Sequence, residues 1–269
     1  MPVSRVLQIE QDLRKKVALE RRLSKEISQV LRKETRSIME SIERTGDIGP
    51  IENEALLQKV LERHYGRVHK VFGDQVSKRL SSKAKLSAQE LAEASSDLAR
   101  QAAFRAANQA NRIMATTVRN AERALNIALQ ERTNKLLEGI PVTNRELSRT
   151  AGRKLQQLSA SRTKAIAAME TNVSAEEAKN KEIEKLIQGR DTSQVQLVKE
   201  WLSQGDSRVR EIHLEADSQE VPIDQPFIVG GESLMYPGDT SLGASPGNVI
   251  NCRCSVFYPE DQIEKLRTV

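Results

Sequence analysis

Apolar residues recur every three or four positions along most of the first 190 residues, which is the spacing of an amphipathic helix. Residues 4–44 show this spacing most clearly, with charged residues between the apolar ones. The spacing and its interruptions predict long helices at residues 4–44, 51–72, 87–138, 144–172 and 175–188, and a shorter helix at 193–203.

Helix breakers and capping boxes set these boundaries. Residues 45–50 contain two glycines and a proline, and Gly139–Pro141 ends the longest helix. Three further segments, Ser87–Glu90, Thr143–Glu146 and Ser174–Glu177, place a Ser or Thr three residues before a Glu. In such a pair each side chain can bond a backbone N–H of the first turn, so we expect a helix to begin at each segment.

The predicted helix at 87–138 carries a stripe of small and apolar side chains. The stripe consists of Phe104, Ala107, Met114, Val118, Ala121, Leu125 and Ala128, with Asn111 as its polar member. Small residues allow a second helix to approach closely, so we expect this stripe to pack against a helix of the same chain or of a neighbouring one. Core packing is a better interpretation of it than a ligand site.

After Gly205 the spacing of apolar residues no longer follows a helical period. Residues 208–216 fit either a helical turn or a strand, and residues 221–229 form an extended segment in which two prolines favour a sheet edge. Residues 249–258 are rich in β-branched and aromatic residues and predict a strand. The predicted fold is therefore mainly α, with a long-helix body at 1–190 and a small C-terminal α+β module at 191–269.

Composition supports the same division. Five of the eight aromatic residues lie in the last 69 of the 269 residues. Residues 201–269 hold 5 Lys and Arg against 11 Asp and Glu, a net −6, which leaves 37 against 26, or +11, on residues 1–200. A basic body suggests nucleic acid or an acidic protein surface as a partner, although charged faces of solvated helices give the same composition.

Several classes of protein find no support in the sequence. No apolar run approaches the roughly 18 residues that a membrane span needs, and the N-terminus shows no apolar signal segment. Two cysteines in a chain of this length do not form a secreted disulfide scaffold, so we expect synthesis in a reducing cytosol. The sequence contains no phosphate-binding loop, nucleophile elbow, HExxH or dinucleotide glycine motif, and we expect no enzyme.

Two of the three histidines are poor candidates for metal ligands. His64 and His69 lie five residues apart on a predicted helix, whereas two ligands on one helix face need a spacing of four. We expect both to be surface or partly packed residues.

His213, Cys252 and Cys254 are the residues that could carry chemistry, because all three lie in the turn-rich module. Two thiolates and an imidazole can bind zinc, with Asp217 or Asp239 as a fourth ligand, and a small module often needs such a site for stability. Structural zinc sites usually use two to four residues between cysteines, so two small buried thiols remain an alternative. A Cys/His hydrolase is a third interpretation.

The C-terminal motifs occur in a specific order: Trp201, Asp206–His213, Val221–Phe227, Tyr236–Asp239 and Asn248–Cys254. This order, over about 193–258, resembles the Mu-F-like phage head morphogenesis domain found in minor head proteins of tailed bacteriophages. The Trp…Asp-x-Arg-x-Arg-x-x-His run and the closing Asn-Cys-Arg-Cys are the most specific marks, and Ala165–Thr171 looks like the helix ahead of that block.

The resemblance implies a structural, non-enzymatic minor head protein that acts in head morphogenesis and, in some relatives, in DNA packaging or ejection. Such a protein would be made in the bacterial cytoplasm and incorporated in the virion, at the portal vertex or capsid interior. The partners it implies are the portal protein, the major capsid or scaffold protein and packaged DNA, with no membrane, and self-association fits the helical stripe. We expect no cofactor other than the zinc ion considered above.

Two alternatives remain. The first is an oligomeric coiled-coil protein that binds nucleic acid, in which the stripe from Phe104 to Ala128 is the oligomer interface. The second is an enzyme that uses a metal ion or a thiolate at Cys252, Cys254 and His213.

Overall fold

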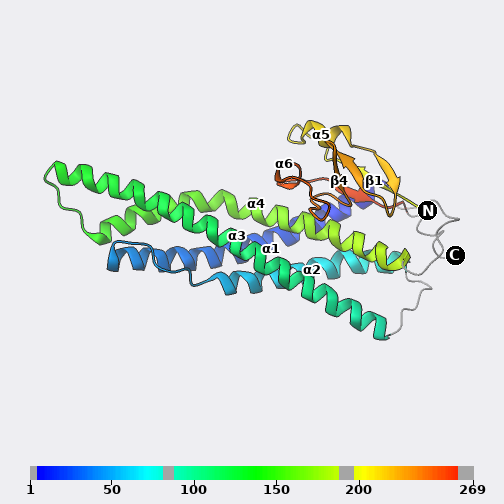
Figure 1. The fold of residues 1–269 in the computed structure, drawn as a ribbon, viewed down its shortest axis with the longest axis horizontal. Coiled ribbons are helices and arrows are strands. Elements are labelled where there is room, and N and C mark those ends of the chain that lie inside the picture. The colour runs from blue at the N-terminus through cyan, green and yellow to red at the C-terminus, as the bar shows by residue number, and fades with distance from the viewer. Residues whose placement is uncertain (1–4, 81–87, 188–196, 260–269) are drawn as a thin grey trace. The chain divides into compact units, whose positions relative to one another are not determined.

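A computed structural model describes residues 5–80, 88–187 and 197–259, and it confirms a mainly α fold (Figure 1). The long helices are α1 (Arg5–Thr45), α2 (Glu54–Leu80), α3 (Ala88–Leu137) and α4 (Asn144–Ile187). The remaining elements are β1 (Val198–Leu202), α5 (Glu211–Glu215), β2 (Glu220–Pro222), β3 (Phe227–Val229), β4 (Glu232–Leu234), α6 (Pro246–Val249) and β5 (Ser255–Phe257). A search of the described helices finds no segment that could cross a membrane.

Helices α1 and α3 match the predicted ranges closely, but α2 continues past its predicted end at residue 72. Gly73 lies inside α2, where a Cβ atom would come within 3.3 Å of the Glu182 side chain of α4. The glycine therefore gives room for a close approach between helices and does not end the helix. The capping box predicted at Ser87–Glu90 begins outside the described residues.

Helix α4 is continuous where two helices were predicted, at 144–172 and 175–188. The Ser174–Glu177 pattern is not a helix start, because Ser174 lies buried inside α4. The Thr143–Glu146 box is confirmed: the Thr143 N–H donates to Glu146 Oε2 at 2.9 Å, and the Glu146 N–H donates to Thr143 Oγ1 at 3.3 Å. The same sequence pattern therefore begins a helix only where the residues before it are not themselves helical.

The chain divides into two compact units, and each combines separate segments. We call residues 21–64 and 96–167 the helical unit, and residues 1–20, 65–95 and 168–269 the C-terminal unit. This division differs from the predicted boundary at residue 190, because parts of α1, α2 and α4 belong to the same unit as the strands.

The helical unit has a core of small and aliphatic side chains. Its buried residues are Ile38, Ile42, Ala121, Ala124, Leu125, Ala128, Leu147, Ala151 and Leu155. The predicted stripe of α3 is correct at Met114, Ala121, Leu125 and Ala128, which are all buried. It is wrong at Phe104, whose side chain is 73% exposed.

The C-terminal unit contains a three-stranded antiparallel sheet in the order β2-β1-β5. Strand β1 contradicts the helix predicted at 193–203. In the sheet, Glu200 pairs with Glu220 of β2 and with Phe257 of β5, and Trp201 pairs with Val256. Lys199 to Leu202 are all buried, so the central position in a covered sheet has overridden the local helical pattern.

The strand predicted at 249–258 is shorter than expected. Val249, the first residue of the predicted strand, is the last residue of α6. A turn follows, and only Ser255–Phe257 joins the sheet as β5. The extended segment predicted at 221–229 divides into the end of β2 and strand β3, and β3 pairs with β4 in a separate two-stranded sheet. Cys252 and Cys254 consequently lie in the turn before β5 and not within a strand.

Candidate functional site

Helix α5 brings His213 into the core of the C-terminal unit. Residues 208–216 were predicted as either a helical turn or a strand, and the structure shows the helix at Glu211–Glu215. His213 is the buried residue of this short helix, with 2% of its surface exposed. Glu211, Leu214 and Glu215 are exposed, so the rest of the helix lies at the surface.

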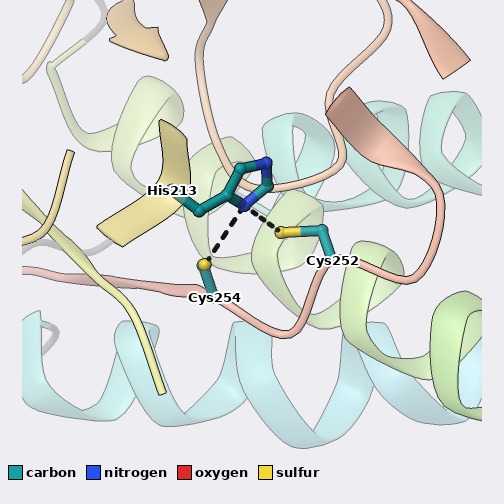
Figure 2. Close-up of side chains that lie close together, drawn as sticks. All are labelled: His213, Cys252 and Cys254. Carbon is teal, nitrogen blue, oxygen red and sulfur yellow. Dashed lines mark hydrogen bonds between the residues drawn. The ribbon is translucent and has the colours of Figure 1, made fainter. Parts of the chain in front are cut away.

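The turn between α6 and β5 directs both cysteines toward His213. Asn251 has a φ of 57°, a left-handed conformation that asparagine adopts more readily than most residues. Cys252 and Cys254 follow, both buried and both free thiols. Each Sγ atom lies 3.5 Å from the same Nδ1 atom of His213, and both contacts are drawn in Figure 2. The structure therefore assembles the three residues that the sequence singled out.

Asn248 of α6 fixes the orientation of the His213 ring. The Asn248 amide nitrogen donates to the carbonyl of Val229 at 2.8 Å and to Glu232 Oε2 at 2.9 Å. Its oxygen, Oδ1, lies 2.7 Å from His213 Nε2. Since Oδ1 can only accept, Nε2 must carry a proton, and in the neutral ring Nδ1 presents its lone pair to the two sulfur atoms.

Trp201 closes another side of the cluster. Its ring meets His213 edge-on, with centroids 5.8 Å apart and planes at 78°, and meets Phe227 in the same way at 5.3 Å. Trp201 is fully buried, and its Nε1–H has no hydrogen-bond partner among the described residues.

The thiols and the imidazole perturb one another's pKa values. The hydrogen bond from Cys254 and the proximity of His213 lower the pKa of Cys252 to about 5, although burial opposes the change. The same contact with Cys252, together with burial, raises the pKa of Cys254. Burial alone would lower the pKa of His213, but its contacts with Cys252 and Asn248 raise it. The cluster therefore favours a deprotonated sulfur at Cys252.

Arg253 ties the Cys-x-Cys segment to the turn after β1. Its guanidinium bonds both carboxylate oxygens of Asp206, with an Nη1–Oδ2 distance of 2.8 Å. The Arg208 backbone N–H donates to the same carboxylate at 3.0 Å, and these contacts, with Arg253 the strongest, hold the pKa of Asp206 well below its usual range. Arg210 bonds the backbone carbonyl of Ile250. The charged residues of the motif thus hold the backbone of the turn in place.

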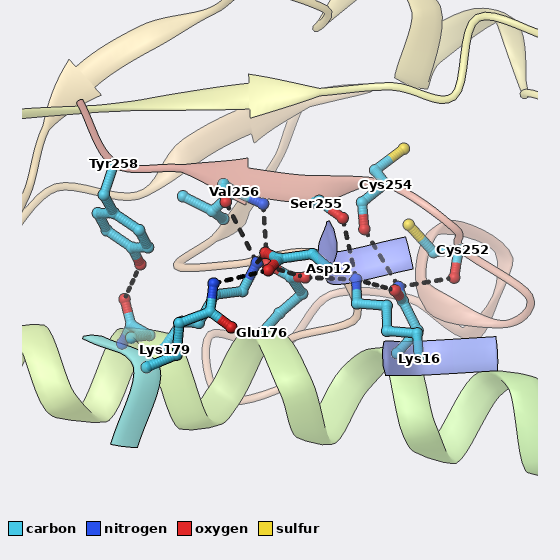
Figure 3. A network of polar contacts seen from close by, with 12 residues as sticks. Asp12, Lys16, Glu176, Lys179, Cys252, Cys254, Ser255, Val256 and Tyr258 are labelled. Atoms are coloured by element: carbon cyan, nitrogen blue, oxygen red, sulfur yellow. Dashed lines mark hydrogen bonds and ion pairs between the residues drawn. The ribbon is translucent and has the colours of Figure 1, made fainter. Parts of the chain in front are cut away.

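Asn172 of α4 also supports this segment, and its partner Lys16 is labelled with both cysteines in Figure 3. Its amide nitrogen donates to the carbonyls of Cys252 and Cys254, at 3.1 Å each. Lys16 of α1 in turn donates to Asn172 Oδ1 at 2.6 Å and to Ser255 Oγ at 2.9 Å. Both cysteines are therefore held through their backbone by residues more than 75 positions away in the chain.

A buried ionic network continues from Lys16 along α4. Glu176 binds Lys16 at 2.6 Å and Lys179 at 2.9 Å, and its second oxygen accepts the Val256 N–H of β5 at 2.8 Å. Lys179 also lies 3.4 Å from Asp12. Burial alone would raise the pKa of Glu176, but the two ammonium groups outweigh it and lower that pKa. The network joins α1, α4 and β5 within the C-terminal unit.

The other predicted ligands do not join the cluster. Asp239 accepts the backbone N–H groups of Met235 and Ser241, and Asp217 accepts that of Ser203 at 2.7 Å. His64 is fully buried in α2, which corrects the prediction of a surface or partly packed residue, and His69 is half-buried. Within the part of the chain that the structure describes, the one group of three metal-capable side chains is His213, Cys252 and Cys254.

Sequence reasoning missed the supporting residues of the site. Asp12, Lys16, Glu176 and Lys179 carry charges inside helices, a pattern that normally indicates a solvated face. Their proximity in space depends on how α1, α4 and β5 pack, which no local spacing encodes. Asn248 stood in the recognised C-terminal motif, but its contact with His213 could not be read from the sequence.

A cavity of about 310 Å³ lies beside the network in the C-terminal unit. Its lining includes Lys16, Asn172, Arg208 and Arg253, together with apolar residues of α1 and β5. His213, Cys252 and Cys254 are not among the lining residues, so the cavity does not open onto the thiols.

Residues 133–257 match the family model described as Phage Mu protein F like protein. No curated protein matches the chain, and no solved structure matches it. The matched range contains α4 and all of the C-terminal motifs, including Trp201, His213 and both cysteines. Over residues 133–257 the chain is therefore similar to the Phage Mu protein F like family, which confirms the resemblance that its C-terminal motifs show.

Proposed function

We propose that this chain is a structural minor head protein of a tailed bacteriophage, associated with the portal vertex or the capsid interior. The observation that carries the proposal is the family match over residues 133–257, which fits a phage head-related protein. The residues of the matched motifs support a structural role, because Trp201 and Asn248 are buried around His213 and the partly exposed Asp206–Arg253 pair holds the Cys-x-Cys segment.

Burial of the chemical groups argues against the enzyme alternative. A hydrolytic thiol needs a substrate cleft and an oxyanion site within reach. Cys252 and Cys254 are 3% and 2% exposed, and the cavity described above does not reach them. The alternative of an oligomeric coiled coil has less support, because Ala121, Leu125 and Ala128 of its supposed interface already pack in the core of one chain.

The test is whether the protein belongs to the particle. Procapsids and virions of a phage that encodes this chain would be purified, and the chain and the portal protein quantified in both by mass spectrometry. We expect a low and fixed ratio of chain to portal, with an abundant host cytosolic protein as the control for carry-over. Absence of the chain from both particles would contradict the proposal.

A deletion phage separates the roles within the head. Complementation with the full chain should restore normal particle yield, whereas the uncomplemented phage should give aberrant heads, or heads that lack DNA if the chain acts in packaging. Filled heads that no longer infect would indicate a role in ejection. Normal yield, filling and infectivity without the chain would reject a role in head morphogenesis.

A further inference from the structure

We propose that His213, Cys252 and Cys254 bind a zinc ion, through Nδ1 of the histidine and both sulfur atoms. This inference does not depend on the proposed function, because it rests on the geometry of the three side chains and on the residues that hold them.

The spacing of the ligand atoms is that of a tetrahedral zinc site. Zinc binds sulfur at about 2.3 Å and imidazole nitrogen at about 2.0–2.1 Å, which places nitrogen and sulfur about 3.5 Å apart when the angle between them is tetrahedral. The observed Nδ1–Sγ distances are 3.5 Å for Cys252 and 3.5 Å for Cys254. All three ligand atoms lie within 4.8 Å of one another.

A hydrogen bond alone explains this arrangement poorly. Nδ1 can carry at most one proton, yet it lies equally close to two sulfur atoms (Figure 2). Because Asn248 Oδ1 requires the proton of the neutral ring on Nε2, the Nδ1 lone pair points at the position between the sulfurs. A metal ion between the three atoms would satisfy all of them.

The supporting residues resemble those that orient metal ligands. A ligating histidine usually donates its second N–H to an oxygen, as His213 does to Asn248, and that contact fixes the ring. The Trp201 ring packs edge-on against the imidazole, with the two ring centroids 5.8 Å apart. Asn172 and Arg253 fix the Cys-x-Cys backbone through its carbonyls and through Asp206.

The donor set selects the metal. Two thiolates and an imidazole suit zinc better than magnesium or calcium, which prefer oxygen. Two thiolates, one neutral imidazole and one Zn²⁺ carry no net charge, so burial of the complete site avoids an uncompensated charge. Among the described residues, three side chains supply ligands.

The first measurement is the metal content of the full-length chain, purified under reducing conditions without a chelator. We expect about one zinc per chain by elemental analysis. Removal of the metal by a strong chelator should lower Tm, and addition of Zn²⁺ should restore it. Replacement by Co²⁺ should produce the sulfur-to-cobalt charge-transfer absorption of thiolate coordination.

Variants locate the metal within the chain. C252S and C254S should each lose most of the stoichiometric zinc, while D217N and D239N, which remove the carboxylates outside the cluster, should retain it. If the cysteine variants fail to fold, the reversible Tm shift and the Co²⁺ spectrum of the unaltered chain still test the proposal.

Two results would overturn it. One is a folded, reduced chain that contains no zinc and takes up neither Zn²⁺ nor Co²⁺ in stoichiometric amount. The other is full zinc content in folded C252S and C254S, which would place the metal elsewhere. A mass lower by two hydrogens in the chain isolated without reductant, together with no metal uptake, would identify a Cys252–Cys254 disulfide in place of a metal site.

Discussion

Glu176 neutralises two buried lysines, so removal of its charge should destabilise the fold more than removal of a surface carboxylate would. We predict that E176Q lowers the free energy of unfolding by about 3–5 kcal/mol, because it leaves Lys16 and Lys179 with only Asp12 as a buried counter-charge. Urea denaturation measures the change.

The matched control is E177Q on the next residue of α4. Glu177 forms an ion pair with Lys181 near the surface, at 2.8 Å, and loss of such a pair costs about 0–1 kcal/mol. Equal losses in the two variants would contradict a special role for the buried network.

Lys199 is a second residue whose environment predicts a measurable effect. It is fully buried, its ammonium donates to the Met235 carbonyl at 2.9 Å and lies 5.1 Å from the Phe227 ring centroid. Burial, opposed by Glu184, Asp239 and Asp224, lowers the pKa of Lys199 to about 8.

Between pH 8 and about 10.4, the ordinary pKa of lysine, the unfolded chain therefore binds more protons at Lys199 than the folded chain. The contribution of Lys199 to stability must rise with pH across this window, by up to about 3 kcal/mol. We predict that the stability difference between the unaltered chain and K199M changes with pH in this sense. K70M, at an exposed position of α2, is the matched control for loss of a lysine, and a stability difference for K199M that does not change with pH would refute the prediction.

At the scale of elements, the sequence predicted those structures that depend on neighbouring residues. The positions of α1 and α3 and the capping box at Thr143–Glu146 follow from local periodicity and from hydrogen bonds three residues apart. Strand β1 was missed because its conformation depends on two partner strands, one of them more than 50 residues away.

The candidate site shows the same limit. The three residues with metal-binding chemistry were identified from their types and from their place in the module. Their mutual distance, the contact with Asn248 and the support from α1 and α4 arise from tertiary packing. The failure of Asp217 and Asp239 as ligands has the same origin, because both carboxylates bind nearby backbone N–H groups.

Substitution of two glycines in the loop before α6 can distinguish the cost of backbone strain from the cost of steric overlap with α4. Gly238 and Gly243 have φ values of 86° and 85°, so alanine is strained at both positions. A Cβ at Gly238 would also lie 2.5 Å from Val173 Cγ2 of α4, whereas nothing lies within 4 Å of that position at Gly243.

We predict that G243A lowers the free energy of unfolding by about 1 kcal/mol and that G238A lowers it by about 1–3 kcal/mol more. Thermal unfolding of the two variants under identical conditions measures the difference. Similar Tm values would mean that α4 does not approach the loop at Val173.

At the scale of the whole molecule, charge follows the structural units and not the order of the chain. The helical unit holds 22 Lys and Arg against 13 Asp and Glu, a net +9, and the C-terminal unit holds 20 against 24, a net −4. The acidic tail inferred from residues 201–269 is thus part of a larger acidic unit. A basic helical unit could lie near DNA phosphates while the acidic unit contacts protein.

This division predicts which basic residues bind DNA. Each phosphate contact that a protein makes contributes about −0.9 to the slope of log K against log salt concentration. In the full chain, the paired substitution R112Q and R123Q removes two exposed charges from α3 in the helical unit, and R14Q and K70Q removes two from the C-terminal unit. We expect the first pair to weaken binding of duplex DNA and to reduce the slope by up to about 2, and the second to leave the slope unchanged. Fluorescence anisotropy across a salt series measures both. Equal slopes for the two pairs, or no binding by the unaltered chain, would exclude the helical unit as a DNA-contacting surface. An acidic protein surface would then be the partner that its positive charge fits.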